Sequence, residues 1–173
     1  RCPGLDVWRP AGGPGASGAW ACAGVRSTGP SALGLSRQNL PPLTGVGMVG
    51  AIRRGGYVLS DMADAQAVIV ATGSETSLAV EAQAALAAEG IATRVVSMPC
   101  MELFAAQDEA YRKRVLPAGP VRGAVEAGVR AGGVDRWLLG EPGRGATAGF
   151  IGMRGLGDSA PDARVDTSTA SPA

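Results

Sequence analysis

The stretch that decides the fold runs from residue 67 to residue 99. It reads AVIVA (67–71), TGSE (72–75), a helix-length segment, and then TRVVSMP (93–99). Short unbroken apolar runs are typical of strands that are buried on both faces of a sheet. The segment between the two runs is rich in alanine and leucine, which favour helix. The stretch therefore predicts a β-α-β unit with parallel strands, and an α/β fold.

Both ends of the predicted helix carry signals in the sequence. Thr72 and Glu75 have the spacing of a capping box, in which the two side chains bind free amides of the first turn. Gly90 stands where a left-handed residue commonly ends a helix. Helical spacing predicts that one face of the helix packs on the sheet, and that this face holds Leu78, Ala82, Ala85 and Leu86. The face directed largely away from the sheet is predicted to hold Glu75, Glu81, Gln83 and Glu89.

The turn before this helix has a second interpretation, because free amides at a helix N-terminus attract anions. A small-ligand site on Gly73 and Ser74 is therefore an alternative. The turn lacks the spacing of the glycine-rich loops that wrap phosphates, and Glu75 would repel an anion, so a helix cap is favoured. Cys100 is a candidate reactive thiol, but no neighbouring cation lowers its pKa, and a buried apolar role is favoured.

Composition excludes several function classes. The chain has 173 residues, 46% of them apolar, and a net charge of +1, which is typical of soluble globular proteins. It has neither the basic face of a nucleic-acid binder nor an apolar run long enough to span a membrane. Three scattered cysteines suggest neither a disulfide framework nor a zinc site, and they fit a reducing cytoplasm. The complete absence of histidine excludes Ser-His-Asp and Cys-His catalysis and imidazole-ligated zinc.

The flanks of the β-α-β unit are less regular. Residues 12–18 contain so much glycine and proline that no helix is expected there. Outside the unit, the predicted strands are residues 6–10, stopped by Pro10, and residues 31–35, 57–59 and 121–127, and the predicted helix is residues 107–115. The strand at 31–35 leads into a polar segment, and polar groups at the carboxyl ends of buried strands commonly contact ligands.

Taken together, these segments resemble transketolase. The resemblance rests on motifs that follow one another at the spacing of that family: WRPA (8–11), GPSAL (29–33), SRQNLP (36–41), ATGSE (71–75), VVSMPC (95–100) and VEAG (125–128). It covers about residue 5 to Pro161. Deoxyxylulose phosphate synthase and the β subunit of 2-oxo acid dehydrogenases share the fold of the C-terminal part, but they fit SRQNLP poorly.

The resemblance implies a fold and a domain organisation. It implies a three-layer α/β domain with a mainly parallel sheet, of the transketolase C-terminal type, preceded by part of the pyrimidine-binding domain. The implied boundaries are residues 1–41 for the partial pyrimidine-binding domain, 42–56 for a linker, 57–161 for the C-terminal domain and 162–173 for a disordered tail.

The resemblance also implies one functional residue. Arg37, the arginine of SRQNLP, matches the family's contact to the sugar phosphate, and its planar fork of donors suits that anion. Ser36 and Gln38 are candidates for positioning the same loop, and Ser36 is a weak candidate for substrate binding. The alternative for Arg37 is an ordinary surface arginine. No catalytic or metal-binding residue is predicted.

The chain departs from the family in several places. Transketolases bind thiamine diphosphate and Mg²⁺ through a Gly-Asp-Gly segment and activate the cofactor with a glutamate, and neither segment is present, so neither ligand is expected to bind this chain alone. Gly12 to Gly15 replace a polar helix start, and Trp137 lacks the histidine that usually accompanies it. The closing helix of the family is replaced by a Ser, Thr, Ala and Pro tail from Asp166.

These observations predict a fragment of a transketolase. In the intact family, the reaction transfers a two-carbon ketol unit from a ketose phosphate to an aldose phosphate in the pentose phosphate pathway, and we expect this chain to be inactive alone. One alternative is a non-catalytic partner of a split transketolase, either as a homodimer or with a complementary N-terminal part. The other is the small-ligand-binding module described above.

Overall fold

The computed structural model describes residues 3–37, 39–43, 46–129 and 148–153. The elements, in chain order, are β1 (Asp6–Trp8), α1 (Gly12–Val25), β2 (Ser31–Leu33), the 3₁₀ helix η1 (Val46–Met48), α2 (Val49–Ile52), β3 (Tyr57–Ser60), β4 (Ala67–Ala71), α3 (Glu75–Ala88), β5 (Thr93–Ser97), α4 (Met101–Ala105), α5 (Glu109–Val115), β6 (Val121–Val129) and β7 (Ala148–Met153).

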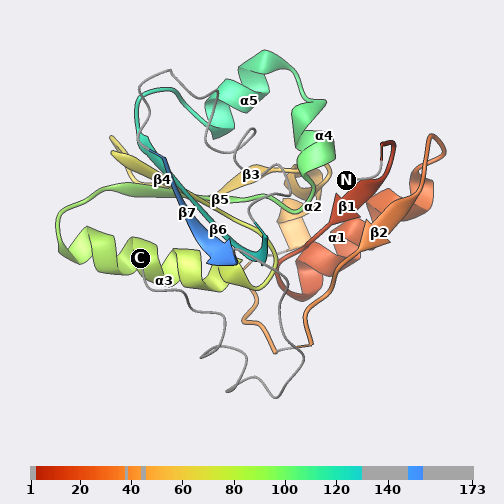
Figure 1. Ribbon diagram of the computed structural model, residues 1–173, viewed down its shortest axis with the longest axis horizontal. Helices are drawn as coiled ribbons and strands as arrows, with labels where there is room; N and C mark the ends of the chain where they lie inside the picture. Colours follow the sequence, from red (N-terminus) through yellow and green to blue (C-terminus); the bar gives the residue numbers. More distant parts are fainter. Residues whose placement is uncertain (1–2, 38, 44–45, 130–147, 154–173) are drawn as a thin grey trace.

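The larger sheet has the strand order β3-β5-β4-β6-β7. β4 pairs in parallel with β5 and with β6, whereas β3 pairs antiparallel with β5 and forms an edge. Helix α3 covers one face of the sheet, and α4 and α5 cover the other (Figure 1). The predicted β-α-β unit and the three-layer, mainly parallel α/β architecture are therefore confirmed.

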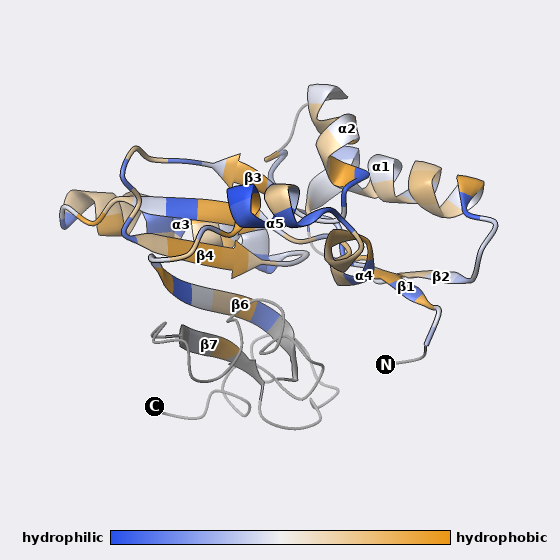
Figure 2. Cartoon of the chain, turned by 90° about the horizontal axis from the view of Figure 1, so that it is seen from above, coloured by the Kyte–Doolittle hydropathy of each residue, from blue (hydrophilic) through white to orange (hydrophobic). Residues whose placement is uncertain are grey.

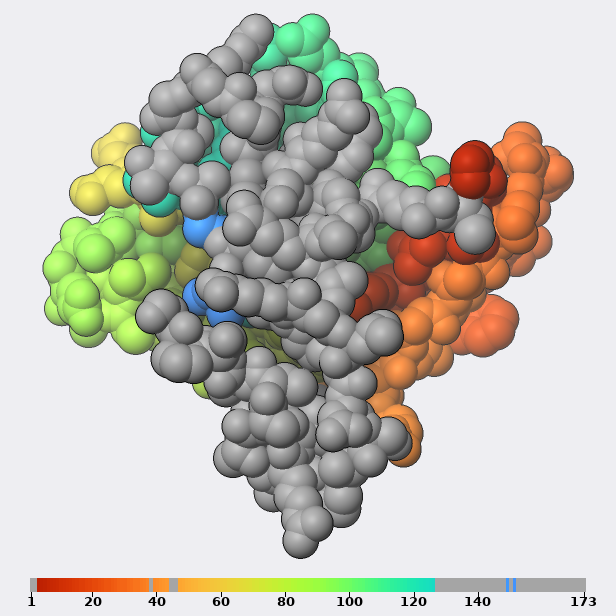
Figure 3. Space-filling view, viewed as in Figure 1, coloured from red at the N-terminus to blue at the C-terminus, as the bar shows by residue number. Residues whose placement is uncertain are grey.

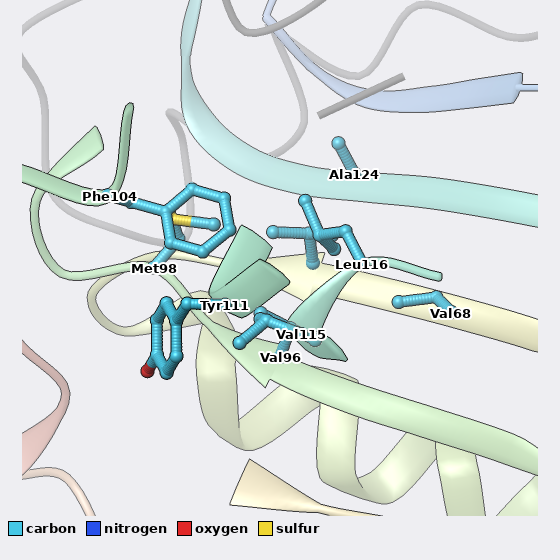
Figure 4. Close-up of a cluster of buried hydrophobic side chains, with 9 residues drawn as sticks. Val68, Val96, Met98, Phe104, Tyr111, Val115, Leu116 and Ala124 are labelled. Atoms are coloured by element: carbon cyan, nitrogen blue, oxygen red, sulfur yellow. The ribbon is translucent and has the colours of Figure 1, made fainter. Parts of the chain in front are cut away.

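Alternate residues of the central strands face the two helical layers. On the side of α4 and α5, the largest buried cluster joins strand residues such as Val68 and Val96 to Phe104 and Tyr111 (Figure 4). On the side of α3, Ala71 and Val95 pack against Ala79. The strands are thus buried on both faces, as their unbroken apolar sequences predict.

Helix α3 turns a different face to the sheet from the one predicted. Its buried residues are Thr76, Ala79 and Gln83, whereas Leu78 is 55% exposed. Gln83 can be buried because its side-chain amide donates a 2.7 Å hydrogen bond to the Thr93 carbonyl. The predicted stripe was therefore wrong for Leu78, Gln83 and the exposed Ala85, because apolar spacing alone did not reveal which face holds the small residues that permit close packing.

A smaller unit lies at one end of the molecule, beside the main sheet (Figure 2). Strands β1 and β2 pair in parallel, and α1 packs beside them. The prediction of no helix at 12–18 was wrong: α1 begins at Gly12 and runs for 14 residues. Pro14 lies in its first turn, where proline removes no helical hydrogen bond. Gly18 faces Ile52 so closely that a Cβ there would lie 3.0 Å from the isoleucine side chain, so the glycine permits the packing.

Residues 42–56, predicted to be a linker, contribute to the core between the two units. They contain η1 and α2, and Ile52 of α2 is fully buried. Ile52 joins Trp8 and Ala19 from the smaller unit to Tyr57 and Cys100 from the larger one. The two units are therefore packed together through shared apolar contacts.

Several predictions concern residues outside the described ranges. They are the role of Gln38, the absence of a histidine beside Trp137, the missing closing helix and the disordered tail.

Candidate functional site

Arg37 lies on the segment that follows β2, and this segment is held by the neighbouring strand. The Gly34 amide donates a 2.8 Å hydrogen bond to the Trp8 carbonyl at the end of β1. Arg37 itself is exposed. Among the residues that the structure describes, no carboxylate forms an ion pair with Arg37. Its guanidinium is thus open to an anion from solution.

A pocket of about 340 Å³ lies beside this segment. It is lined by Pro10, Gly12, Gly13, Ala16, Leu35, Ser36, Asn39 and Leu40. Gly12 has a φ of +69° and begins α1, whose N-cap residue Ala11 supplies no side-chain hydrogen bond. The pocket therefore has first-turn residues of a helix on one side and the SRQNLP segment on the other. Of the predicted residues, Ser36 lines this pocket, and Arg37 adjoins it in sequence.

A second polar cluster lies at the carboxyl ends of β4 and β6. The Arg9 guanidinium donates a hydrogen bond to the Glu126 carboxylate, and Thr72 donates to the other oxygen of that carboxylate. Glu75 Oε2 lies 3.6 Å from Arg9 Nη2. Glu126 is 5% exposed, so its charge is balanced almost entirely within the protein.

This cluster corrects the prediction of a capping box. Ser74, not Thr72, is the N-cap of α3, and it makes no side-chain cap hydrogen bond. The Thr72 hydroxyl is instead committed to Glu126, and Glu75 binds the Ser74 hydroxyl and faces Arg9. The prediction of a helix-ending glycine is confirmed, because Gly90 has a φ of +80° and Ile91 donates a hydrogen bond to the Leu86 carbonyl.

The roles of Arg9 and Glu126 were missed at the sequence level. A carboxylate within the apolar run of β6 was a usable signal, because a charge on a buried strand requires a partner. The partner could not be identified from the sequence, since Arg9 and Glu126 are 117 residues apart.

The turn at Gly73 and Ser74 is occupied by contacts within the protein. The Gly73 amide donates a 3.0 Å hydrogen bond to the Arg9 carbonyl, and the Ser74 hydroxyl donates to Glu75. The amide and the hydroxyl that a ligand would use are therefore already bonded.

Cys100 is fully buried in the core between the two units. Burial, the largest cause, and the nearby Glu102 and Asp6 carboxylates together raise the pKa of its thiol to about 12. A neutral thiol is a poor nucleophile, so the prediction of a buried apolar role is confirmed.

The residues that the structure describes assemble no metal site. No group of three or more His, Cys, Asp or Glu side chains comes together within the described part of the chain. Glu75 and Glu126, which do lie close together, face the Arg9 guanidinium. A cation in that position would have to displace it.

An apolar surface is exposed on the smaller unit. Trp20 is 61% exposed, Val25 74% and Leu35 51%. A shallow pocket of about 550 Å³ lies here, lined by Trp20, Ala23, Gly24, Gly29, Pro30, Ser31, Leu33 and Leu35. In Figure 3, α1 and β2 (orange) form the edge of the molecule opposite α3 (light green). We call this the Trp20 surface. None of the described helices is long and apolar enough to cross a membrane.

Comparison with known proteins identifies the family. Residues 55–169 match the transketolase-like TK C-terminal domain. The transketolase of Rhodobacter capsulatus is 53% identical over 165 residues, which are 94% of this chain and 24% of that protein. The transketolase structure from Leishmania mexicana has a TM-score of 0.82 at 41% identity, over 96% of this chain and 23% of that one.

A third structure, the inactive β4 tetramer of a split-gene transketolase, has a TM-score of 0.69 at 25% identity, over 89% of this chain and 50% of that one. The chain spans about a quarter of the length of the curated relatives it matches. It belongs to the transketolase family, whose C-terminal domain it contains.

Proposed function

We propose that this chain is the C-terminal part of a cytoplasmic transketolase, in which Arg37 binds the phosphate of a sugar substrate. The complete enzyme would transfer a two-carbon ketol unit from a ketose phosphate to an aldose phosphate in the pentose phosphate pathway. Residues 1–41 would complete the pyrimidine-binding domain, residues 42–56 would connect it, and residues 57–161 would form the C-terminal domain.

The observation that carries this proposal is the setting of Arg37. It belongs to an intact SRQNLP motif, it has no carboxylate partner among the described residues, and it adjoins Ser36 in the wall of a pocket. A guanidinium presents parallel N–H donors that match two phosphate oxygens, and such charge-assisted bonds are stronger than neutral ones.

The test compares a phosphorylated sugar with the same sugar lacking phosphate. Calorimetric titration of the 173-residue chain should show tighter binding of ribose 5-phosphate than of ribose. Arg37→Gln should weaken binding of the phosphate ester by about 10- to 100-fold and leave ribose unaffected. Lys113→Gln is the matched control, because it removes an exposed positive charge on α5. Equal affinities for the two sugars, or an unchanged affinity in Arg37→Gln, would contradict the proposal.

The chain alone should not catalyse ketol transfer, because its sequence has neither the Gly-Asp-Gly segment nor the activating glutamate of the family. The purified chain, supplied with thiamine diphosphate, Mg²⁺ and both sugar phosphates, should form no product above the background without protein. Product formation that depends on the chain would overturn this expectation.

A second candidate function is that of a subunit in a split transketolase, and the Trp20 surface favours it. This surface exposes a tryptophan and two further apolar side chains beside the short β1–β2 sheet. Large exposed apolar patches commonly mark interaction sites. The partner would be the complementary N-terminal part, which would extend the β1–β2 sheet and cover α1.

This candidate can be tested by co-expression with the N-terminal remainder of the Rhodobacter capsulatus enzyme. The two parts should co-purify, and Trp20→Glu should abolish co-purification because it buries a charge in the contact. Leu78→Glu is the matched control, since Leu78 is 55% exposed on the distant helix α3. Failure of the unmodified chain to co-purify would exclude this mode of assembly, as would equal effects of the two substitutions.

A further inference from the structure

The carboxyl edge of the larger sheet has the topology of a ligand-binding edge. β4 pairs in parallel with β5 on one side and with β6 on the other. The chain therefore adds β5 on one side of β4 and then returns to add β6 on the other side, so the strand order reverses between β4 and β6. In open α/β sheets, ligands bind outside the carboxyl ends of the strands at such a position. In this chain Arg9, a residue that lies outside this sheet, occupies that position.

The Arg9 side chain faces one carboxylate from β6 and one from α3, and is 32% exposed. Glu126 of β6 accepts a hydrogen bond from Arg9 and is itself oriented by Thr72, which follows β4. Glu75 of α3 completes the site. Its Oε2 lies 3.6 Å from Arg9 Nη2, and its side chain is 14% exposed. Two carboxylates around one planar cation are suited to a guanidinium, because its fork of donors can reach both at once.

The backbone of Arg9 is held at the same place. Its amide donates a 2.7 Å hydrogen bond to the Pro99 carbonyl after β5, and its carbonyl accepts one from Gly73. The backbone of Arg9 is thus joined to the segments that follow β4 and β5, and its side chain is joined to Glu126 within β6. The preceding residue, Trp8, pairs with Leu33 of β2 and accepts the Gly34 hydrogen bond. Any shift of Arg9 would therefore move the segment that carries Arg37.

We propose that Glu126, Glu75 and Thr72 at this edge form an arginine-binding site, filled by the chain's own Arg9. In this proposal Arg9 is a positioning residue that fixes the β1–β2 unit, and with it the Arg37 segment, against the larger sheet. An effect of Arg9 on the binding of a sugar phosphate rests on the proposed function of Arg37. The docking of Arg9 against the larger sheet does not rest on it.

The experiment measures hydrogen exchange of the 173-residue chain, in which docking is visible without any ligand. Arg9→Ala should raise exchange at the amides of β1 and β2 by about tenfold and leave those of β4 and β5 unchanged. Millimolar methylguanidinium should reverse the increase, because it refills the vacated position, whereas the same concentration of methylammonium should not.

Two further variants separate docking from general loss of folding. Arg26→Met is the matched control, because Arg26 pairs with Asp6 at 2.9 Å inside the smaller unit. It should not produce an increase that methylguanidinium reverses. Thr72→Val keeps the side-chain shape but removes the hydrogen bond to Glu126, and it should raise exchange at β1 and β2 by a smaller factor.

The proposal is overturned if Arg9→Ala leaves exchange at β1 and β2 unchanged, or if methylguanidinium fails to reverse the increase. It is also overturned if methylammonium restores protection equally well. Sugar phosphate titration of Arg37→Gln is independent of these readouts. A negative result there would refute the phosphate site and leave the arginine site standing.

Discussion

Gly55 lies so close to the backbone at the start of α4 that there is no room for a side chain. Its φ is +81°, and a Cβ at this position would lie 2.4 Å from the Cys100 carbonyl oxygen and 2.5 Å from the Phe104 amide. Its own carbonyl accepts a 2.9 Å hydrogen bond from Cys100. A side chain would therefore have to displace the start of α4.

Gly55→Ala should accordingly lower the free energy of unfolding by about 3 kcal/mol, from the left-handed backbone and the overpacking together. Gly90→Ala is the matched control, since Gly90 has a φ of +80° but nothing within 4 Å of the added Cβ. It should cost about 1 kcal/mol. Urea denaturation measures both, and equal losses would show that the close contact is unimportant.

Cys100 predicts a dependence of stability on alkaline pH. Its pKa in the folded chain is raised from 9.0 to about 12 by burial, so between these values the unfolded thiol loses its proton while the folded thiol keeps it. The unfolded state then binds fewer protons, and the free energy of unfolding falls as pH rises through this window.

Cys100→Ala should therefore make the decline of stability above pH about 9 shallower. Part of the decline should persist, because burial also raises the pKa of Tyr57 and Tyr111. Urea midpoints measured from neutral to alkaline pH give the two slopes. Parallel slopes for the variant and the unmodified chain would contradict the role of this thiol, whatever the difference in stability at neutral pH.

At the scale of elements, α1 forms against its own composition. Its glycines allow the helix to approach α2 and the β1–β2 sheet closely, and Gly15 and Gly18 are buried. Helix formation costs more at glycine than at other residues apart from proline, so packing must supply the stability that propensity does not.

The glycines of α1 should respond to substitution according to the space around them. Gly24 has nothing within 4 Å of an added Cβ, so Gly24→Ala should raise the free energy of unfolding by about 1 kcal/mol through helix propensity. Gly18→Val should lower it by about 2 kcal/mol, because the added atoms would clash with Ile52. Thermal unfolding followed by circular dichroism measures both, and a stabilising Gly18→Val would refute the close packing of α1 on α2.

At the scale of the whole molecule, the core around Ile52 joins the smaller unit, α2 and the larger sheet. A shared core of this kind couples the unfolding of its parts. The chain should therefore unfold in one transition, with tryptophan fluorescence and circular dichroism giving coincident curves.

Ile52→Ala should lower the free energy of unfolding by about 3 kcal/mol and separate the two curves, since it leaves a cavity between the units. Leu78→Ala, at an exposed site on α3, should change stability by less than about 0.5 kcal/mol and keep the curves coincident. Separate curves in the unmodified chain would show that the units unfold independently.

Elements with local sequence signals could be predicted without the structure. The buried strands at β4 and β5, the glycine that ends α3 and the family motifs depend on residues close to one another in the chain, so each could be read from its own segment. The position of Arg37 in the SRQNLP motif was available in the same way, although its binding role is still a prediction.

Three features became apparent only in the folded chain: helix α1, the buried face of α3 and the pairing of Arg9 with Glu126. Each depends on contacts between distant segments, where the fit of side chains and the burial of charge outweigh local propensity. The capping box shows the same effect. The spacing of Thr72 and Glu75 permitted a cap, but a buried carboxylate from β6 required the Thr72 hydroxyl, and satisfying that charge took precedence over capping the helix.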